Sequence, residues 1–205
     1  MMKKMMMKKK GYAKGGMKKK GYAKGGMKKK GYAKGGMMKK GAAKGGAMTL
    51  AKIRSAAKAK GYNQVVWTDA NTHEYLEEAG TMNVFFRVND TLLTAPTNDR
   101  ILDGITRKSL IELAKSQGIN VEVRPVKVAE IVEAAENGSL KEMFGAGTAA
   151  VISPISGFTH KEKAFDLPKM EDAYATKLKK QLTELQANRA EDPFGWRYEV
   201  PAIEV

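Results

Sequence analysis

The clearest alternation of side-chain types along the chain lies just after Glu78. Between Thr81 and Phe86, the residues at odd positions alternate with those at even positions, and both sets consist of types that suit a pleated, largely buried sheet. Asn89 and Asp90 then predict a turn towards a second strand at Thr91–Thr94. The pattern therefore places Glu78 at the start of a strand, where a carboxylate is most often simply solvated.

Helical and strand-like patterns alternate through the rest of the chain after residue 48. Apolar spacing near three or four residues predicts helices at 49–60, 106–118, 128–136 and 173–188. Short apolar runs predict strands at 64–67, 121–124 and 149–153, with further pairing at 74–76. The inward face of the longest helix is expected to carry Tyr174, Leu178, Leu182 and Leu185, and that of the first helix Leu50, Ile53, Ala56 and Ala57. Strands that alternate with helices predict a mixed α/β domain with one core.

Composition separates the beginning of the chain from this domain. The first 47 residues hold 17 lysines and no acidic residue, so the formal charge of +15 becomes −2 for residues 48–205. A ten-residue unit that begins at Gly11 recurs from Gly21, nearly recurs from Gly31, and has an altered copy at Gly41. Units with so few branched apolar residues bury too little surface to offset backbone entropy. We therefore expect a disordered basic leader over residues 1–40 and a folded domain over residues 41–205.

Two interpretations of this leader remain open. Lysine-rich tracts are typical of segments that bind nucleic acids or anionic surfaces through counterion release. The alternative is a degenerate extension that copies the Gly-Ala-Ala-Lys-Gly-Gly word at residues 41–46, and we favour it because the leader has no arginine and its tyrosines only repeat with the unit. We accordingly expect no specific nucleic-acid partner. No apolar run is long enough to cross a membrane, and the absence of cysteine excludes disulfides.

Four short motifs together resemble one family. They are Glu-x-Gly-Thr-Met-Asn-x-Phe-Phe (78–86), Ile-Leu-x-Gly-x-Thr-Arg (101–107), Phe-Gly-x-Gly-Thr-Ala (144–149) and Glu-Asp-Pro-Phe-Gly-Trp (191–196). In this order and at this spacing they resemble the branched-chain amino-acid aminotransferases, which are pyridoxal-phosphate enzymes of fold type IV. The resemblance runs from about Gly41 to Val200 and covers only the larger, C-terminal domain of that family, which has the fold of the D-amino-acid aminotransferases.

The resemblance implies that Lys44 and Glu78 carry the main chemistry. Lys44 matches the lysine whose amine holds the aldehyde of pyridoxal 5'-phosphate and then moves the Cα proton. Three leader lysines, Lys14, Lys24 and Lys34, have nearly the same surroundings, but only Lys44 stands close to the folded domain. Glu78 matches the carboxylate that keeps the pyridine nitrogen protonated. The adjacent Glu77 carries the same charge, so charge alone does not decide which glutamate has this role. The motif selects Glu78.

Further matches concern the phosphate and the substrate. A phosphate suits a helix N-terminus, where free N–H groups and the helix dipole converge. The resemblance assigns this role to the backbone of Ile105 and Thr106 and to the hydroxyl of Thr148. The same residues taken alone, glycine and threonine before a helix, indicate no more than a cap. Thr81 and Ala149 match positions near the substrate carboxylate.

The implied activity is transfer of the amino group of leucine, isoleucine or valine to 2-oxoglutarate, by a cytoplasmic homo-oligomer. The sequence departs from the family just after Lys44: the family continues with x-Gly-Gly-Asn-Tyr, this chain continues with Gly45-Gly46-Ala47-Met48-Thr49, and the tyrosine that contacts the cofactor is missing. The phosphate-binding arginine and most of the side-chain pocket come from the family's smaller domain, which the leader does not resemble. The alternative hypothesis is therefore a catalytically inactive, truncated or artificial domain with a basic tail that binds nucleic acid or anionic surfaces non-specifically.

Overall fold

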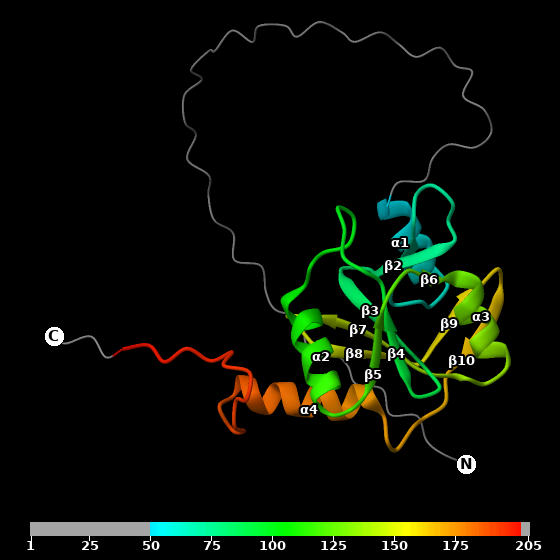
Figure 1. Cartoon of the computed structure of the whole chain (residues 1–205). Coiled ribbons are helices and arrows are strands. Elements are labelled where there is room, and N and C mark those ends of the chain that lie inside the picture. Colours follow the sequence, from blue (N-terminus) through cyan, green and yellow to red (C-terminus); the bar gives the residue numbers. More distant parts are fainter. Residues whose placement is uncertain (1–49, 202–205) are drawn as a thin grey trace, which may run out of the picture. The chain divides into compact units, whose positions relative to one another are not determined.

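An eight-stranded sheet with helices on both faces dominates the part of the chain that the computed structural model describes, residues 50–201 (Figure 1). The helices are α1 (Leu50–Ala59), α2 (Ile105–Ser116), α3 (Val128–Glu136) and α4 (Tyr174–Gln186). The strands of the large sheet are β1 (Val66–Thr68), β2 (Tyr75–Ala79), β3 (Met82–Val88), β4 (Thr91–Thr94), β5 (Asn120–Val123), β6 (Val126–Lys127), β7 (Leu140–Gly147) and β8 (Val151–Ile155). A separate hairpin is formed by β9 (Gly157–His160) and β10 (Lys163–Asp166).

Strand β3 is the centre of the sheet. Along one edge it pairs with β7 for its whole length, and along the other it pairs first with β2 and then with β4. Its middle residues are fully buried, and the rings of Phe85 and Phe144 stack with centroids 5.1 Å apart. Because β-branched and aromatic residues pack well on a pleated surface, this strand forms the most regular part of the core.

The two faces of the sheet are covered by different helices (Figure 1). Phe85 faces the cluster built with α2 and α4, which includes Leu110, Leu178 and Leu182. The next residue, Phe86, faces the opposite cluster, where Ile131 of α3 packs. This alternation follows from the two-residue period of a strand, and it leaves the ends of β3 as the places where polar groups enter the core.

A polar cluster closes the C-terminal end of β3. The buried guanidinium of Arg87 lies 2.9 Å from Glu142 of β7 and 3.3 Å from Asp172, and it stacks over the ring of Tyr174 at 3.8 Å. Glu142 also accepts the backbone N–H groups of Tyr174 and Ala175 at 2.8 and 3.0 Å, at the start of α4. The cluster therefore fixes the N-terminus of α4 to the sheet with both carboxylate oxygens engaged.

The mixed α/β architecture and the four helices agree with the sequence expectation, and so does the inward face of α4. The strand said to begin at Glu78 is wrong. Glu78 belongs to β2, and a two-residue loop at Gly80 and Thr81 turns the chain into β3. Gly80 has a positive φ of 65°, which glycine adopts at no steric cost, so a hairpin turn replaces the continuous strand.

Three other expectations needed correction. The strand placed at 149–153 starts at Val151, because Thr148 and Ala149 lie in the loop after β7. The helix placed at 106–118 starts at Ile105 after an extended Gly104, so Thr106 lies in its first turn rather than before it. The expected apolar face of α1 has no buried residue. Strands β6, β7, β9 and β10 had no separate sequence prediction.

Several expectations lie outside the described residues. They concern Lys44, the leader of residues 1–40 and the boundary near Gly41, and they stay predictions. Within residues 50–201, no helix is long and apolar enough to span a membrane, and no cluster of histidine and acidic residues has the makings of a metal site.

Candidate active site

The site is built around the carboxylate of Glu78 on β2. Its Oε1 accepts a hydrogen bond from the backbone N–H of Leu102 at 3.0 Å and a longer one from the Asn83 amide at 3.4 Å. Within the described residues, its Oε2 accepts none. One oxygen is thus held by the protein, and the second remains available to a donor that comes from outside.

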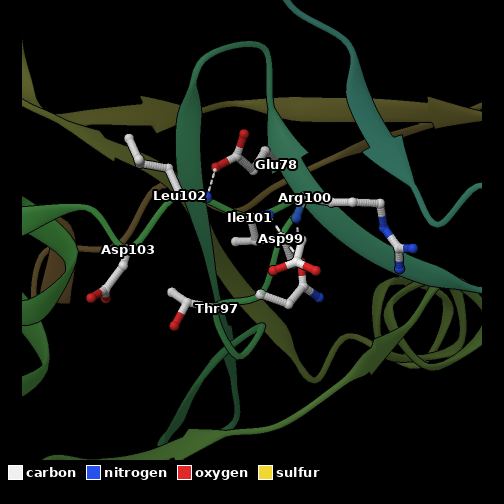
Figure 2. Close-up of a pocket in the computed structure, with 8 residues that line it drawn as sticks. Glu78, Thr97, Asp99, Arg100, Ile101, Leu102 and Asp103 are labelled. Carbon is white, nitrogen blue, oxygen red and sulfur yellow. Dashed lines mark hydrogen bonds between the residues drawn. The ribbon is translucent and has the colours of Figure 1, made fainter.

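A cavity of about 480 Å³ lies beside this carboxylate (Figure 2). It is lined by Glu78 and by the loop of residues 97–103 that leads from β4 to α2. Figure 2 shows the Glu78 carboxylate directed at the backbone of Leu102, whereas the Arg100 side chain extends away. The loop therefore brings the chain from the sheet, past the carboxylate, to the start of α2.

The adjacent Glu77 has a different environment. Side chains alternate along a strand, so Glu77 and Glu78 leave β2 on opposite faces. Glu77 is buried and forms an ion pair of 2.7 Å with Arg100. It lines a second cavity of about 310 Å³, and Glu78 is absent from that lining. The structure thus distinguishes the two carboxylates, which their charges alone did not.

The start of α2 offers backbone donors. Gly104 precedes the helix with extended backbone, no side chain caps it, and no acidic residue occupies its first turn. Within the described residues, the N–H groups of Ile105 and Thr106 have no hydrogen-bond acceptor. Ile105 is exposed, whereas Thr106 is buried. Free N–H groups and the helix dipole together favour an anion at this position.

The helix also carries a buried cation. Arg107 follows Thr106 in the first turn and donates from Nη2 to the carbonyl of Ala95 at 2.8 Å, while its buried Nε has no hydrogen-bond partner in the described part of the chain. Burial lowers the pKa of Arg107, with Asp103 acting in the opposite direction. Unlike Arg87, Arg107 has no carboxylate in contact among the described residues.

The other expected site residues lie in two hairpin loops at the same end of the sheet. Thr81 is exposed in the β2–β3 loop, and Thr148 and Ala149 are exposed in the loop between β7 and β8. Asn83 of β3 pairs with Ala146 of β7, so these loops continue from neighbouring strands. None of the three residues has a hydrogen bond to Glu78 or to the start of α2.

Asn83 is the residue that the sequence prediction missed. It is buried, it pairs with Glu78 across the β2–β3 hairpin, and its Nδ2 donates to the carbonyl of Leu102 at 2.9 Å. Its Oδ1 lies against Gly104, so close that a β-carbon on Gly104 would collide with it. The signal was present as an asparagine inside a strand of apolar residues, because a buried amide has to find partners.

The chain is similar to known proteins of one family. The model of the amino-transferase class IV family matches residues 41–158. A probable branched-chain-amino-acid aminotransferase of Staphylococcus epidermidis is 43% identical over 146 residues, which cover 71% of this chain and 41% of that protein. Branched-chain-amino-acid aminotransferase 2 of Bacillus subtilis is 39% identical over 153 residues, covering 74% of this chain and 42% of that protein.

Solved structures share the fold. The branched-chain amino acid aminotransferase from Escherichia coli superimposes with a TM-score of 0.57 at 27% identity, over 71% of this chain and 46% of that one. An aminotransferase from Brucella abortus bound to the co-factor PLP gives a TM-score of 0.54 at 27% identity, over 66% and 43% of the two chains. The chain thus spans about two fifths of the length of the curated relatives that it matches.

Proposed function

Because this chain belongs to the amino-transferase class IV family, we propose that it is a branched-chain amino-acid transaminase, or the major domain of one. In this proposal the amino group of leucine, isoleucine or valine passes to 2-oxoglutarate with pyridoxal 5'-phosphate as cofactor. The observation that carries it is the half-engaged carboxylate of Glu78 beside a cavity and beside the uncapped start of α2.

The described residues fit this cofactor at two of its groups. A protonated pyridine nitrogen is a donor, and Oε2 of Glu78 is an acceptor with no partner in the described part of the chain. A phosphate is an anion, and the N–H groups of Ile105 and Thr106 are donors without acceptors. The third group, an amine for the aldehyde, is proposed to be Lys44, which lies outside the described residues.

Each residue then has a defined part in the reaction. When bound, the cofactor withdraws electrons from the substrate's Cα and so weakens its bond to hydrogen. Glu78 holds a proton on the pyridine nitrogen, and the start of α2 holds the phosphate with Thr148. Lys44 would carry the proton between Cα of the substrate and C4′ of the cofactor. Thr81 and Ala149 are proposed to orient the substrate carboxylate from their exposed loops.

The proposal is tested on the full chain in two steps. Mixing with pyridoxal 5'-phosphate, reducing with borohydride and mapping peptides by mass identifies the lysine that carried the cofactor. We expect the label on Lys44, and loss of that label in Glu78→Ala. Incubation with leucine and 2-oxoglutarate should then yield glutamate. Label spread evenly over Lys14, Lys24, Lys34 and Lys44, unchanged by Glu78→Ala, would exclude a site.

The proposal extends to the organisation of the chain. We propose that residues 1–40 form a separate basic leader, that residues 41–205 form the catalytic domain, and that the domain acts as a homo-oligomer in the cytoplasm. Removal of residues 1–40 should leave the melting temperature of the remainder nearly unchanged. Sedimentation across a range of salt concentrations measures the oligomer, and a monomer throughout would contradict this part.

A further inference from the structure

We propose that Asn83 is a positioning residue that couples the carboxylate of Glu78 to the start of α2, so that the ring and the phosphate of the cofactor bind as one unit. The inference rests on the proposed function for the identity of the ligand. It goes beyond that function because it assigns a role to a residue that neither the motif interpretation nor the comparisons assign.

The first step of the argument is the position of Asn83. It lies on β3 directly opposite Glu78 of β2, and opposite Ala146 of β7 on its other side. The side chain is 5% exposed, and a buried amide without partners is costly, so its hydrogen bonds determine its orientation. Pairing on both edges fixes the backbone of this residue, so its amide has a rigid base.

The second step is that one amide serves both halves of the site. Nδ2 reaches Oε1 of Glu78 at 3.4 Å and the carbonyl of Leu102 at 2.9 Å. The N–H of Leu102 in turn donates to the same Oε1 at 3.0 Å. Glu78, Asn83 and Leu102 therefore form a closed triangle of hydrogen bonds, in which the bond between Asn83 and Glu78 is the longest.

The third step joins this triangle to the helix. Oδ1 of Asn83 lies against the α-carbon of Gly104, the residue that precedes α2. The N–H of Gly104 donates to the carbonyl of Leu102 at 2.8 Å, and Leu102 is the loop residue that Asn83 holds. The position of the free N–H groups of α2 relative to Glu78 is thus set through Asn83, and glycine is required at 104 because a β-carbon has no room.

Coupling of this kind is measurable with a ligand that needs no lysine. Pyridoxine 5'-phosphate has an alcohol in place of the aldehyde, so it binds without forming an imine with Lys44. Pyridoxine lacks the phosphate as well. Dissociation constants of both ligands for the full chain and for Glu78→Gln form a double-mutant cycle between the carboxylate and the phosphate.

In the parent chain, removing the phosphate from the ligand and replacing Glu78 by Gln should each lower the affinity. We expect these two losses of affinity to be non-additive, by a factor of about ten in dissociation constant. In the Asn83→Ala background the coupling factor should fall towards one. A residue that only supports the fold would lower all affinities and leave the coupling factor intact. Thr94→Val is the matched control, because Thr94 is a buried polar residue of the sheet that donates to Val84 at 2.9 Å and, within the described part of the chain, has no side-chain hydrogen bond to Glu78, Leu102 or Gly104.

A measurement without any ligand tests the same triangle. Hydrogen exchange of the Leu102 amide should accelerate by about tenfold in Asn83→Ala and stay unchanged in Thr94→Val. If Asn83→Ala does not fold, Gly104→Ala takes its place, because its β-carbon would displace Oδ1 while leaving the amide in the core.

The outcomes separate this inference from the proposed function. A coupling factor near one in the parent chain, or an unchanged factor in Asn83→Ala, overturns the role of Asn83 even if the cofactor binds. No binding of pyridoxine 5'-phosphate to the parent chain overturns the proposed function and the coupling with it. Unchanged exchange at Leu102 in both Asn83→Ala and Gly104→Ala overturns the positioning of the loop.

Discussion

The two ends of β3 are built from the same parts and differ in how completely those parts are satisfied. At each end a buried polar residue of β3 faces a glutamate on a neighbouring strand: Arg87 faces Glu142 of β7, and Asn83 faces Glu78 of β2. Glu142 has both oxygens engaged, by Arg87 and by two backbone N–H groups of α4. Glu78 has one oxygen engaged and the other free among the described residues.

The difference has a physical consequence at the two helices that these glutamates serve. Glu142 caps α4, so the start of that helix is closed by a carboxylate of the protein itself. Among the described residues no side chain caps α2, so its start is open to a charged ligand. The closed end contributes stability, and the open end keeps unsatisfied groups that a ligand can satisfy. This comparison can be tested by removing one group at a time.

The largest expected effect is on stability, from Glu142→Ala. The substitution leaves the buried Arg87 without its closest partner and uncaps α4, and removing one member of a buried pair typically costs about 3 kcal/mol or more. Urea denaturation should show the loss as a lower midpoint. Glu142→Gln, which keeps the shape and one acceptor, should cost clearly less. Equal losses in the two variants would mean that the charge of Glu142, and not its packing or its remaining acceptor, stabilises this end.

The second prediction concerns the open end, where we expect a substitution to affect ligand binding more than stability. Glu78→Gln removes the charge at the open end, so we expect the free energy of unfolding to change by less than about 1 kcal/mol. Its dissociation constant for pyridoxine 5'-phosphate should rise by about tenfold or more, because hydrogen bonds to charged groups contribute about 1.5–3 kcal/mol. Calorimetric titration measures the binding.

The adjacent carboxylate provides the control for that prediction. Glu77→Gln removes an identical charge from the other face of β2 and weakens the ion pair with Arg100. It should affect ligand affinity much less than Glu78→Gln does. If the two variants lost affinity equally, the site would respond to total charge rather than to one placed carboxylate, and the contrast between the ends of β3 would fail.

How much of this was predictable from sequence differs between the fold and the site. The helices were predictable because apolar spacing dictates which face is buried, as in α4 with Leu178, Leu182 and Leu185. The hairpin at Gly80 was not predictable. Alternating residues before and after a turn form the same pattern as one continuous strand, and only the positive φ of Gly80 reveals the turn. Motifs located Glu78 and the start of α2 as separate segments. The side-chain bonds of Asn83, which depend on strand register, were beyond any sequence pattern.

The third prediction sharpens the comparison with a second buried arginine. Although burial works in the opposite direction, hydrogen bonds with Glu142, Asp172 and Asp90 raise the pKa of Arg87. Burial instead lowers the pKa of Arg107, whose Nε is unpartnered. Arg107→Met should therefore change the free energy of unfolding by no more than about 1 kcal/mol, because a buried charge without a close partner contributes little net stability. Arg87→Met should cost about 3 kcal/mol, and equal urea midpoints for the two variants would contradict the distinction.

The smallest expected effect comes from a third carboxylate, Asp69, which lies away from β3. Like Glu142, it has both oxygens engaged: Oδ1 accepts the N–H of Thr72 at 2.6 Å, and Oδ2 accepts those of Glu74 and Tyr75 at 2.9 and 3.0 Å. These backbone hydrogen bonds, that of Thr72 first, hold the pKa of Asp69 well below its ordinary value of 3.8. Asp69 thus shows whether satisfied hydrogen bonds alone stabilise a carboxylate that forms no ion pair with any described residue.

The sign of the pH effect follows from that lowered pKa. A carboxyl group whose pKa is lower in the folded state contributes stability that is complete above its unfolded pKa, near 3.8, and is lost as the pH falls below that value. Urea midpoints at pH 7, 4 and 3 should therefore fall more steeply for the parent chain than for Asp69→Asn, which cannot be protonated. Other acidic groups with lowered pKa values, such as Asp172 and Glu130, titrate in both proteins and cancel in the difference. Parallel acid curves would show that the hydrogen bonds to Asp69 contribute no net stability, so satisfied backbone hydrogen bonds would not by themselves stabilise this carboxylate.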